Sequence, residues 1–151
     1  MSQPILLQKT MKWTNYWDNM QQQIFVLRII FLGLITGPAL FLAVTQFILI
    51  DRALVEFMEF VIAGAVVSIA AIAFSFLLPN FKDKFGGTNS GSRYTTYKII
   101  QLAVLEGAAL LNAVAFYLTG HPQSLTIGIC LVLLMAIRFP SEAEMNKLFG
   151  Q

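Results

Sequence analysis

The segment that decides the fold is IIQLAVLEGAALLNAVAFYLT, residues 99–119. Among its 21 residues only one, Glu106, carries a charged side chain. A helix of roughly 20 predominantly apolar residues crosses the hydrocarbon core of a bilayer, which is about 30 Å thick. The segment is therefore predicted to be a transmembrane helix that contains a carboxyl group.

Three further segments have the composition of a membrane span: residues 29–50, 60–79 and 124–137. The first two contain 22 and 20 residues without a charge, whereas the last is shorter and needs Pro122 and Gln123 to complete it. Only 12% of the 151 residues are charged and 57% are hydrophobic, while soluble domains carry roughly 25% charged residues. The sequence predicts an all-α integral membrane four-helix bundle.

The lysines and arginines predict the orientation, because short cytoplasmic loops are enriched in them. Arg52 lies between the first two spans, beside Asp51 and Glu56. The other nine precede the first span, separate the second from the third, or follow the fourth: Lys9, Lys12, Arg28, Lys82, Lys84, Arg93, Lys98, Arg138 and Lys147. Both termini are therefore expected in the cytoplasm (N-in/C-in), with the spans in a bacterial-type plasma (inner) membrane.

An internal repeat appears when the chain is shifted by 70 residues. RIIFLGLITGPALFLAV (28–44) aligns with KIIQLAVLEGAALLNAV (98–114), and eight of 17 positions are identical. The alignment predicts two tandem parallel helical hairpins related by a pseudo-two-fold axis along the membrane normal.

The expected organisation has five parts: an N-terminal cytoplasmic or interfacial segment (1–23), hairpin 1 (24–80), a cytoplasmic linker (81–97), hairpin 2 (98–140) and a cytoplasmic C-terminal helix (141–151). The N-terminal segment is either a helix lying in the membrane interface or an early start of the first span. In the C-terminal helix, Ser141 and Glu144 have the spacing of a capping box.

Glu106 is the candidate functional residue. Insertion scales put the cost of a charged side chain at the helix centre at roughly 2.5–3.5 kcal/mol, and loss of water favours the neutral carboxyl group. A neutral acid within reach of water exchanges a proton or binds a cation. In the structural alternative, the protonated carboxyl only bonds a neighbouring helix, with a contribution of about 0.6–2 kcal/mol.

The repeat aligns Thr36 with Glu106, each eight residues past a cationic residue, Arg28 or Lys98. At 1.5 Å per residue this places both about 12 Å deep. If the first and third spans meet at the pseudo-axis, the Thr36 hydroxyl and the Glu106 carboxyl face each other. Gly37 and Pro38 are expected to give the first span local flexibility, either as a plain kink or as part of an ion site in a discontinuous helix.

Small residues predict where the helices pack. Gly64, Ser68, Ala71 and Ser75 follow one another at spacings of 4, 3 and 4, and Ala109 and Ala113 share the helical face of Glu106. Such residues allow two helix backbones to approach closely. Asn112, about 120° around the helix from Glu106, is expected to bond a neighbouring helix.

Several chemistries find no support in the sequence. It has no metal-ligand cluster, no nucleophile–His–acid set and no phosphate-binding loop, and its single histidine excludes haem held by two histidines. We therefore expect no enzyme activity, cofactor or metal site. The basic residues follow the topology, so nucleic acid is not an expected partner. The expected partners are the lipid bilayer and either further copies in a homo-oligomer or the subunits of a membrane complex.

The stretch LEGAALLNAVAFYLTG (105–120), followed by RFPSEAEM (138–145), resembles a group of uncharacterised bacterial four-helix membrane proteins, which brings no known activity. A weaker similarity is to the proteolipid c subunits of rotary ATPases, which are helical hairpins with one lipid-buried acid and small packing residues. That resemblance implies a proton-exchanging role for Glu106. The chain departs from it because the acid lies in the first helix of its hairpin, the glycine-repeat helix is missing and the expected orientation differs.

Two functions remain open from the sequence. The first is a small channel, transporter or proteolipid-like component with Glu106 as its proton or cation site, assisted by Thr36. The alternative is a non-transporting structural or assembly subunit of a larger membrane complex.

Overall fold

The computed structural model describes residues 4–48, 58–86 and 90–149, with side chains described from residue 21 onward except at 48. Its elements are α1 (Pro4–Ile48), α2 (Met58–Leu77), the 3-10 helix η2 (Leu78–Lys84), α3 (Ser90–Thr119), α4 (Pro122–Ile137) and α5 (Glu142–Phe149). The described ranges contain no strand, so the all-α class is confirmed. Among the described residues, three helices are long and apolar enough to cross a membrane, or four if the bent pair α4 and α5 counts as one span.

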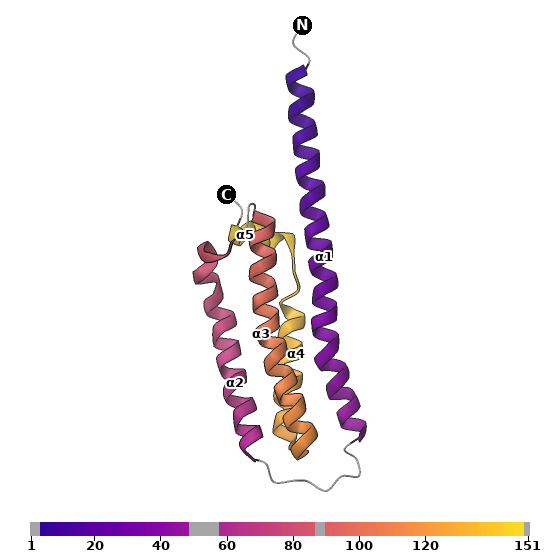
Figure 1. The fold of residues 1–151 in the computed structure, drawn as a ribbon, viewed down its shortest axis with the longest axis vertical. Coiled ribbons are helices and arrows are strands. Elements are labelled where there is room, and N and C mark those ends of the chain that lie inside the picture. Colours follow the sequence, from indigo (N-terminus) through magenta and orange to yellow (C-terminus); the bar gives the residue numbers. More distant parts are fainter. Residues whose placement is uncertain (1–3, 49–57, 87–89, 150–151) are drawn as a thin grey trace.

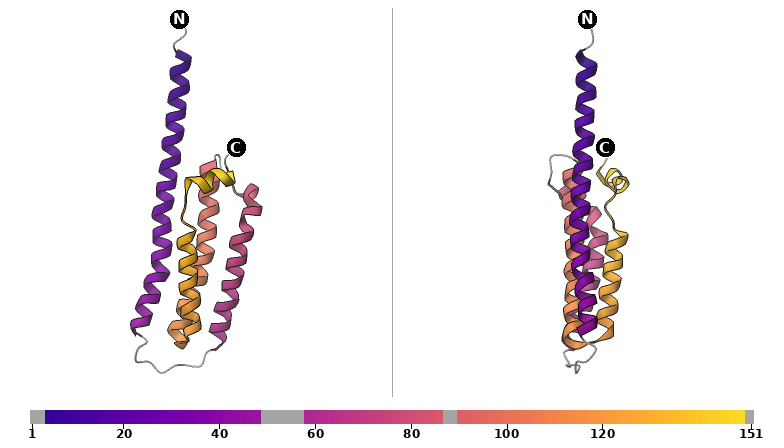
Figure 2. Two further views of the ribbon diagram at one scale, coloured as in Figure 1. Left: turned by 180° about the vertical axis from the view of Figure 1, so that it is seen from behind. Right: turned by 90° about the vertical axis from the view of Figure 1, so that its right-hand side faces the viewer.

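α3 occupies the centre of the bundle and packs against α1, α2 and α4 (Figure 1). α1 and α2 lie on opposite sides of it in Figure 1 and in the left view of Figure 2. The alternating helix directions bring the start of α3 and the short helix α5 to one end, which we call the α5 end. The connection between α3 and α4 lies at the other end, which we call the turn end.

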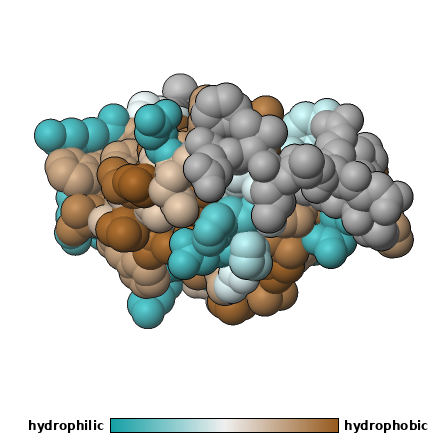
Figure 3. All heavy atoms as spheres, turned by 90° about the horizontal axis from the view of Figure 1, so that it is seen from below, coloured by the Kyte–Doolittle hydropathy of each residue, from teal (hydrophilic) through white to brown (hydrophobic). Residues whose placement is uncertain are grey.

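The interior consists of two clusters of apolar side chains. The cluster at the α5 end comprises Ile24, Leu27, Leu78, Tyr94, Tyr97, Met145 and Phe149. The middle cluster comprises Phe31, Ala71, Leu102, Leu105, Ala108, Ala109, Leu131 and Met135. Many large apolar residues remain on the outside, among them Ile69 and Ile137, which are 69% and 80% exposed. From the turn end, apolar residues form much of the visible surface between scattered hydrophilic ones (Figure 3). An apolar exterior of this kind suits hydrocarbon as the solvent.

The turn from α3 to α4 is short. Gly120 has a φ of 63°, a conformation that glycine adopts without the strain that a side chain causes. The His121 N–H donates to the Thr119 hydroxyl at 3.1 Å, and Pro122 starts α4 at a position where a missing N–H costs nothing. This chemistry holds α3 and α4 together as an antiparallel pair.

α4 is the shortest of the long helices, with 16 residues. It ends at Ile137, where the Arg138 N–H bonds the carbonyls of Leu134 and Met135. The chain then turns, and α5 lies at 79° to α4. α5 rests on the bundle, because its apolar residues Met145 and Phe149 are buried in the cluster at the α5 end.

Some element boundaries differ from those expected. α1 is one continuous helix that includes most of the predicted N-terminal segment 1–23. The predicted linker 81–97 contains part of η2 and the first turns of α3, which begins at Ser90. The acidic loop with Asp51, Arg52 and Glu56 lies outside the described residues.

The two hairpins pack differently. α1 contacts α3, as the proposed pseudo-axis requires, and α3 packs directly on α4. α1 and α2, by contrast, are held apart by α3 (Figures 1 and 2). The tandem repeat and the cytoplasmic position of the termini therefore stay predictions.

Candidate functional site

Glu106 lies on the side of α3 that faces α1, where it is partly exposed. A Cβ atom built on Gly37 would lie 3.7 Å from Glu106 Oε1, so the carboxyl group rests against the backbone of α1 at Gly37. Within the described part of the chain, Glu106 takes part in neither of the two ion pairs and in no hydrogen bond. The acid thus lies at the flank of the bundle, and none of the side chains that the structure describes bonds to it.

The structure does not join Thr36 to Glu106. The Thr36 hydroxyl donates to the carbonyl of Leu32 in its own helix at 2.6 Å, and the side chain is exposed. Threonine often bonds the carbonyl one turn earlier in this way. The Thr36 side chain therefore lies on the exposed surface of α1.

Gly37 and Pro38 contribute through the backbone. α1 continues as a helix through Pro38. Because proline has no N–H, the carbonyl of Leu34 loses its usual helical donor. Pro38, which removes this donor, directly follows Gly37, the residue whose backbone lies against the Glu106 carboxyl group.

The predicted packing residues are buried as a group. Gly64, Ser68, Ala71 and Ser75 are all buried in α2, and Ala109 and Ala113 are fully buried in α3. Asn112 joins the two helices, because its amide donates to the Gly64 carbonyl at 3.2 Å and to the Ser68 hydroxyl at 2.7 Å. A Cβ on Gly64 would lie only 2.8 Å from Asn112 Oδ1, so only glycine fits there without a shift.

Sequence reasoning missed a charged cluster at the α5 end. The Lys98 ammonium group is fully buried and donates to both oxygens of Glu144, at 2.8 and 2.6 Å. The Tyr94 hydroxyl donates to the same carboxylate at 2.8 Å and accepts the N–H of Ser141 at 3.2 Å. These bonds fasten α5 to α3.

The cluster also changes the expected capping box. The Glu144 N–H does bond the Ser141 hydroxyl, at 3.2 Å. The Glu144 carboxylate, however, turns to Lys98 and Tyr94 because a buried ammonium is a stronger partner than a backbone N–H. The one signal in the sequence was an acid in the tail and a lysine at the start of the third span, 46 residues apart.

No family model, no curated protein and no solved structure matches this chain. The resemblance drawn from residues 105–120 stays an expectation. Among the described residues, no group of three or more His, Cys, Asp or Glu side chains could hold a metal ion. What the Glu106 site offers chemically is one carboxyl group beside the backbone of α1 at Gly37, next to Pro38, which has no N–H.

Proposed function

We propose that this protein is a small multi-pass membrane protein in which Glu106 binds and releases a proton or a cation, as part of a channel, a transporter or a proteolipid-like assembly. The observation that carries the proposal is the position of the Glu106 carboxyl group near the middle of α3. It is partly exposed at the α1–α3 flank and has no hydrogen-bond or ion-pair partner among the described residues. An ionisable residue inside a membrane is expensive to maintain and is a functional candidate for that reason.

The α1 backbone offers a possible partner to both the protonated and the ionised form of the Glu106 carboxyl group. The protonated carboxyl can donate to a carbonyl, and Pro38 leaves that of Leu34 without its helical donor. The ionised carboxyl and the same carbonyl are both oxygen ligands of the kind that hard cations prefer. Gly37 brings the α1 backbone close to the carboxyl group, since a Cβ atom built there would lie 3.7 Å from Glu106 Oε1.

Two apolar grooves are formed by described residues on the outside of the bundle, beside α4, and Glu106 lines neither of them. A path for ions along Glu106 is therefore proposed to run at the flank, between this chain and a neighbouring subunit, as in a homo-oligomer or a larger complex.

The test is an infrared pH titration of the purified protein in lipid bilayers. The wild type is expected to show an infrared band of the protonated carboxyl group that titrates reversibly. This band is expected to be absent from Glu106→Gln. Glu59→Gln is the matched control, since Glu59 is an exposed acid in the first turn of α2. Survival of the titrating band in Glu106→Gln would refute the proposal.

A flux measurement then separates exchange from transport. Vesicles containing the wild type should take up protons or monovalent cations under an imposed gradient, and those containing Glu106→Gln should behave like empty vesicles. A carboxyl band that never titrates, together with equal fluxes, would instead favour a sealed structural hydrogen bond.

One observation favours the second candidate, a non-transporting assembly subunit. α1 has 45 residues against 30 in α3, and its first turns project alone beyond the α5 end (Figures 1 and 2). An isolated helix is marginal in water, so a projecting one suits contact with another subunit or the membrane surface. In that case fixed partners should co-purify with the wild type and with Glu106→Gln, and be lost when residues 4–20 are removed.

A further inference from the structure

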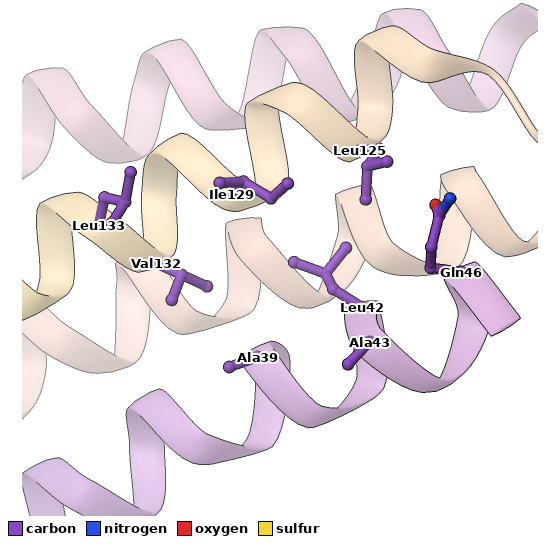
Figure 4. Close-up of a pocket in the computed structure, with 8 residues that line it drawn as sticks. All are labelled: Ala39, Leu42, Ala43, Gln46, Leu125, Ile129, Val132 and Leu133. Carbon is purple, nitrogen blue, oxygen red and sulfur yellow. The ribbon is translucent and has the colours of Figure 1, made fainter.

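Two apolar grooves run along α4, one on each side. The groove between α4 and α1 has a volume of about 440 Å³ and extends from Leu133 to Leu125 on α4 and from Ala39 to Gln46 on α1 (Figure 4). The groove between α4 and α2 has a volume of about 280 Å³ and is bounded by residues such as Ile69, Ile72 and Leu131. Gln46 is the one strongly polar side chain in the first groove, and it lies at the turn end (Figure 4).

An arginine stands above each groove, on the side of the α5 end. The Arg138 guanidinium lies 4.6 Å from the centre of the Phe76 ring of α2. The Arg28 guanidinium of α1 lies 5.5 Å from the centre of the Phe139 ring, in the link after α4. Phe139 in turn packs edge-to-face on Phe31, with ring centres 5.1 Å apart. The two cations are thus held by aromatic rings at fixed places rather than left free at the surface.

The spacing between arginine and groove suits one elongated ligand. At the α2–α4 groove, Phe76, the ring partner of Arg138, lies four residues beyond Ile72. At the α1–α4 groove, Arg28 lies eleven residues before Ala39. At 1.5 Å per residue, the ring that holds Arg138 stands about 6 Å beyond the end of its groove, and Arg28 stands about 16 Å beyond the end of its own groove along α1. The short α4 and the 79° turn to α5 leave this region open, and Ile137 beside it is 80% exposed.

Neither arginine is neutralised by the described part of the chain. The two ion pairs found there are Arg93 with Asp83 and Lys98 with Glu144. A guanidinium that lies over a ring keeps N–H donors at its edge, and these match phosphate oxygens in a bidentate arrangement. A positive group above an apolar groove therefore complements a ligand with an anionic head and a hydrocarbon chain.

We propose that each flank of α4 binds one anionic phospholipid. The phosphate of one lipid pairs with Arg28, and one of its acyl chains lies in the α1–α4 groove. The phosphate of the other pairs with Arg138, and its chain lies in the α2–α4 groove. A partner helix would fill an apolar groove equally well, but it would leave the two arginines without an anion.

The test counts bound lipids by native mass spectrometry of the full chain in detergent, titrated with phosphatidylglycerol or with phosphatidylcholine of the same acyl chains. The wild type is expected to retain two phosphatidylglycerol molecules and to bind phosphatidylcholine more weakly. Because a cation near the headgroups is worth about 1 kcal/mol, Arg28→Gln and Arg138→Gln should each weaken one site about fivefold. The double variant should weaken both sites.

The control is Lys82→Gln with Lys84→Gln, which removes two positive charges at the same end but away from the flanks of α4. This pair should leave both lipids bound. Ala39→Phe fills the α1–α4 groove from an exposed position and should remove the lipid of Arg28 only. Equal binding of the two lipids, or an equal loss in the lysine control, would overturn the proposal; the latter result would mean general attraction between a basic end and anionic lipid.

Discussion

The Lys98–Glu144 ion pair gives the sharpest prediction about stability. The Lys98 side chain is 0% exposed and that of Glu144 is 24% exposed. Glu144→Leu strands a buried ammonium, and loss of one partner of a buried pair typically costs about 3–5 kcal/mol. Lys98→Met strands a carboxylate that still reaches solvent and keeps its bond from Tyr94, so its cost should be smaller, about 1–3 kcal/mol.

The double variant tests whether the cost of Glu144→Leu comes from the unpaired charge of Lys98. Lys98→Met with Glu144→Leu leaves no stranded charge, so it should unfold with a smaller loss of free energy than Glu144→Leu alone. The measurement is reversible unfolding in mixed micelles, followed by circular dichroism as the denaturing detergent is increased. Glu142→Leu, at an exposed acid of the same helix, is the control and should stay within about 0.5 kcal/mol of the wild type. Additive costs, or a larger cost for Lys98→Met than for Glu144→Leu, would refute the reasoning.

Two further predictions concern packing and orientation. Gly64→Ala places a methyl group 2.8 Å from Asn112 Oδ1 and should destabilise the bundle by about 1–3 kcal/mol; Gly107→Ala, which meets no atom within 4 Å, should be neutral or stabilising by up to about 1 kcal/mol in the same unfolding assay. In a cysteine-free background, Gly86→Cys should react with an impermeant maleimide only from the cytoplasmic face of the membrane, and Gln123→Cys only from the opposite face; labelling of both from one side would contradict the predicted orientation.

The helices could be predicted from the sequence because a bilayer requires long, uninterrupted apolar segments. The seam of Gly64, Ser68, Ala71 and Ser75 was equally readable, since small residues at helical spacing mark the face that packs. The structure buries that seam against α3, with Asn112 bonded across it. Features that depend on the spacing of residues along a single helix could therefore be predicted from the sequence.

Features that depend on how two helices are rotated against each other could not be predicted from the sequence. The predicted repeat aligns Thr36 with Glu106 but does not give the direction of its side chain, which is exposed on the surface of α1. The contact between Lys98 and Glu144 requires α4 to end early at Ile137 and α5 to turn back over the bundle. No local pattern states where a helix stops relative to a distant lysine, so this cluster emerged only from the three-dimensional arrangement.

The central position of α3 has a consequence for biogenesis. The first two helices leave the ribosome before the helix that they pack against, and they lie on opposite sides of it (Figures 1 and 2). A nascent chain that has inserted only α1 and α2 therefore lacks the contacts that hold the bundle together. α3 then provides the surface against which both α1 and α2 pack. α4 follows it in the chain after the short turn at Gly120 and His121. We therefore expect assembly of the bundle to begin when the third helix is present, rather than with the first hairpin.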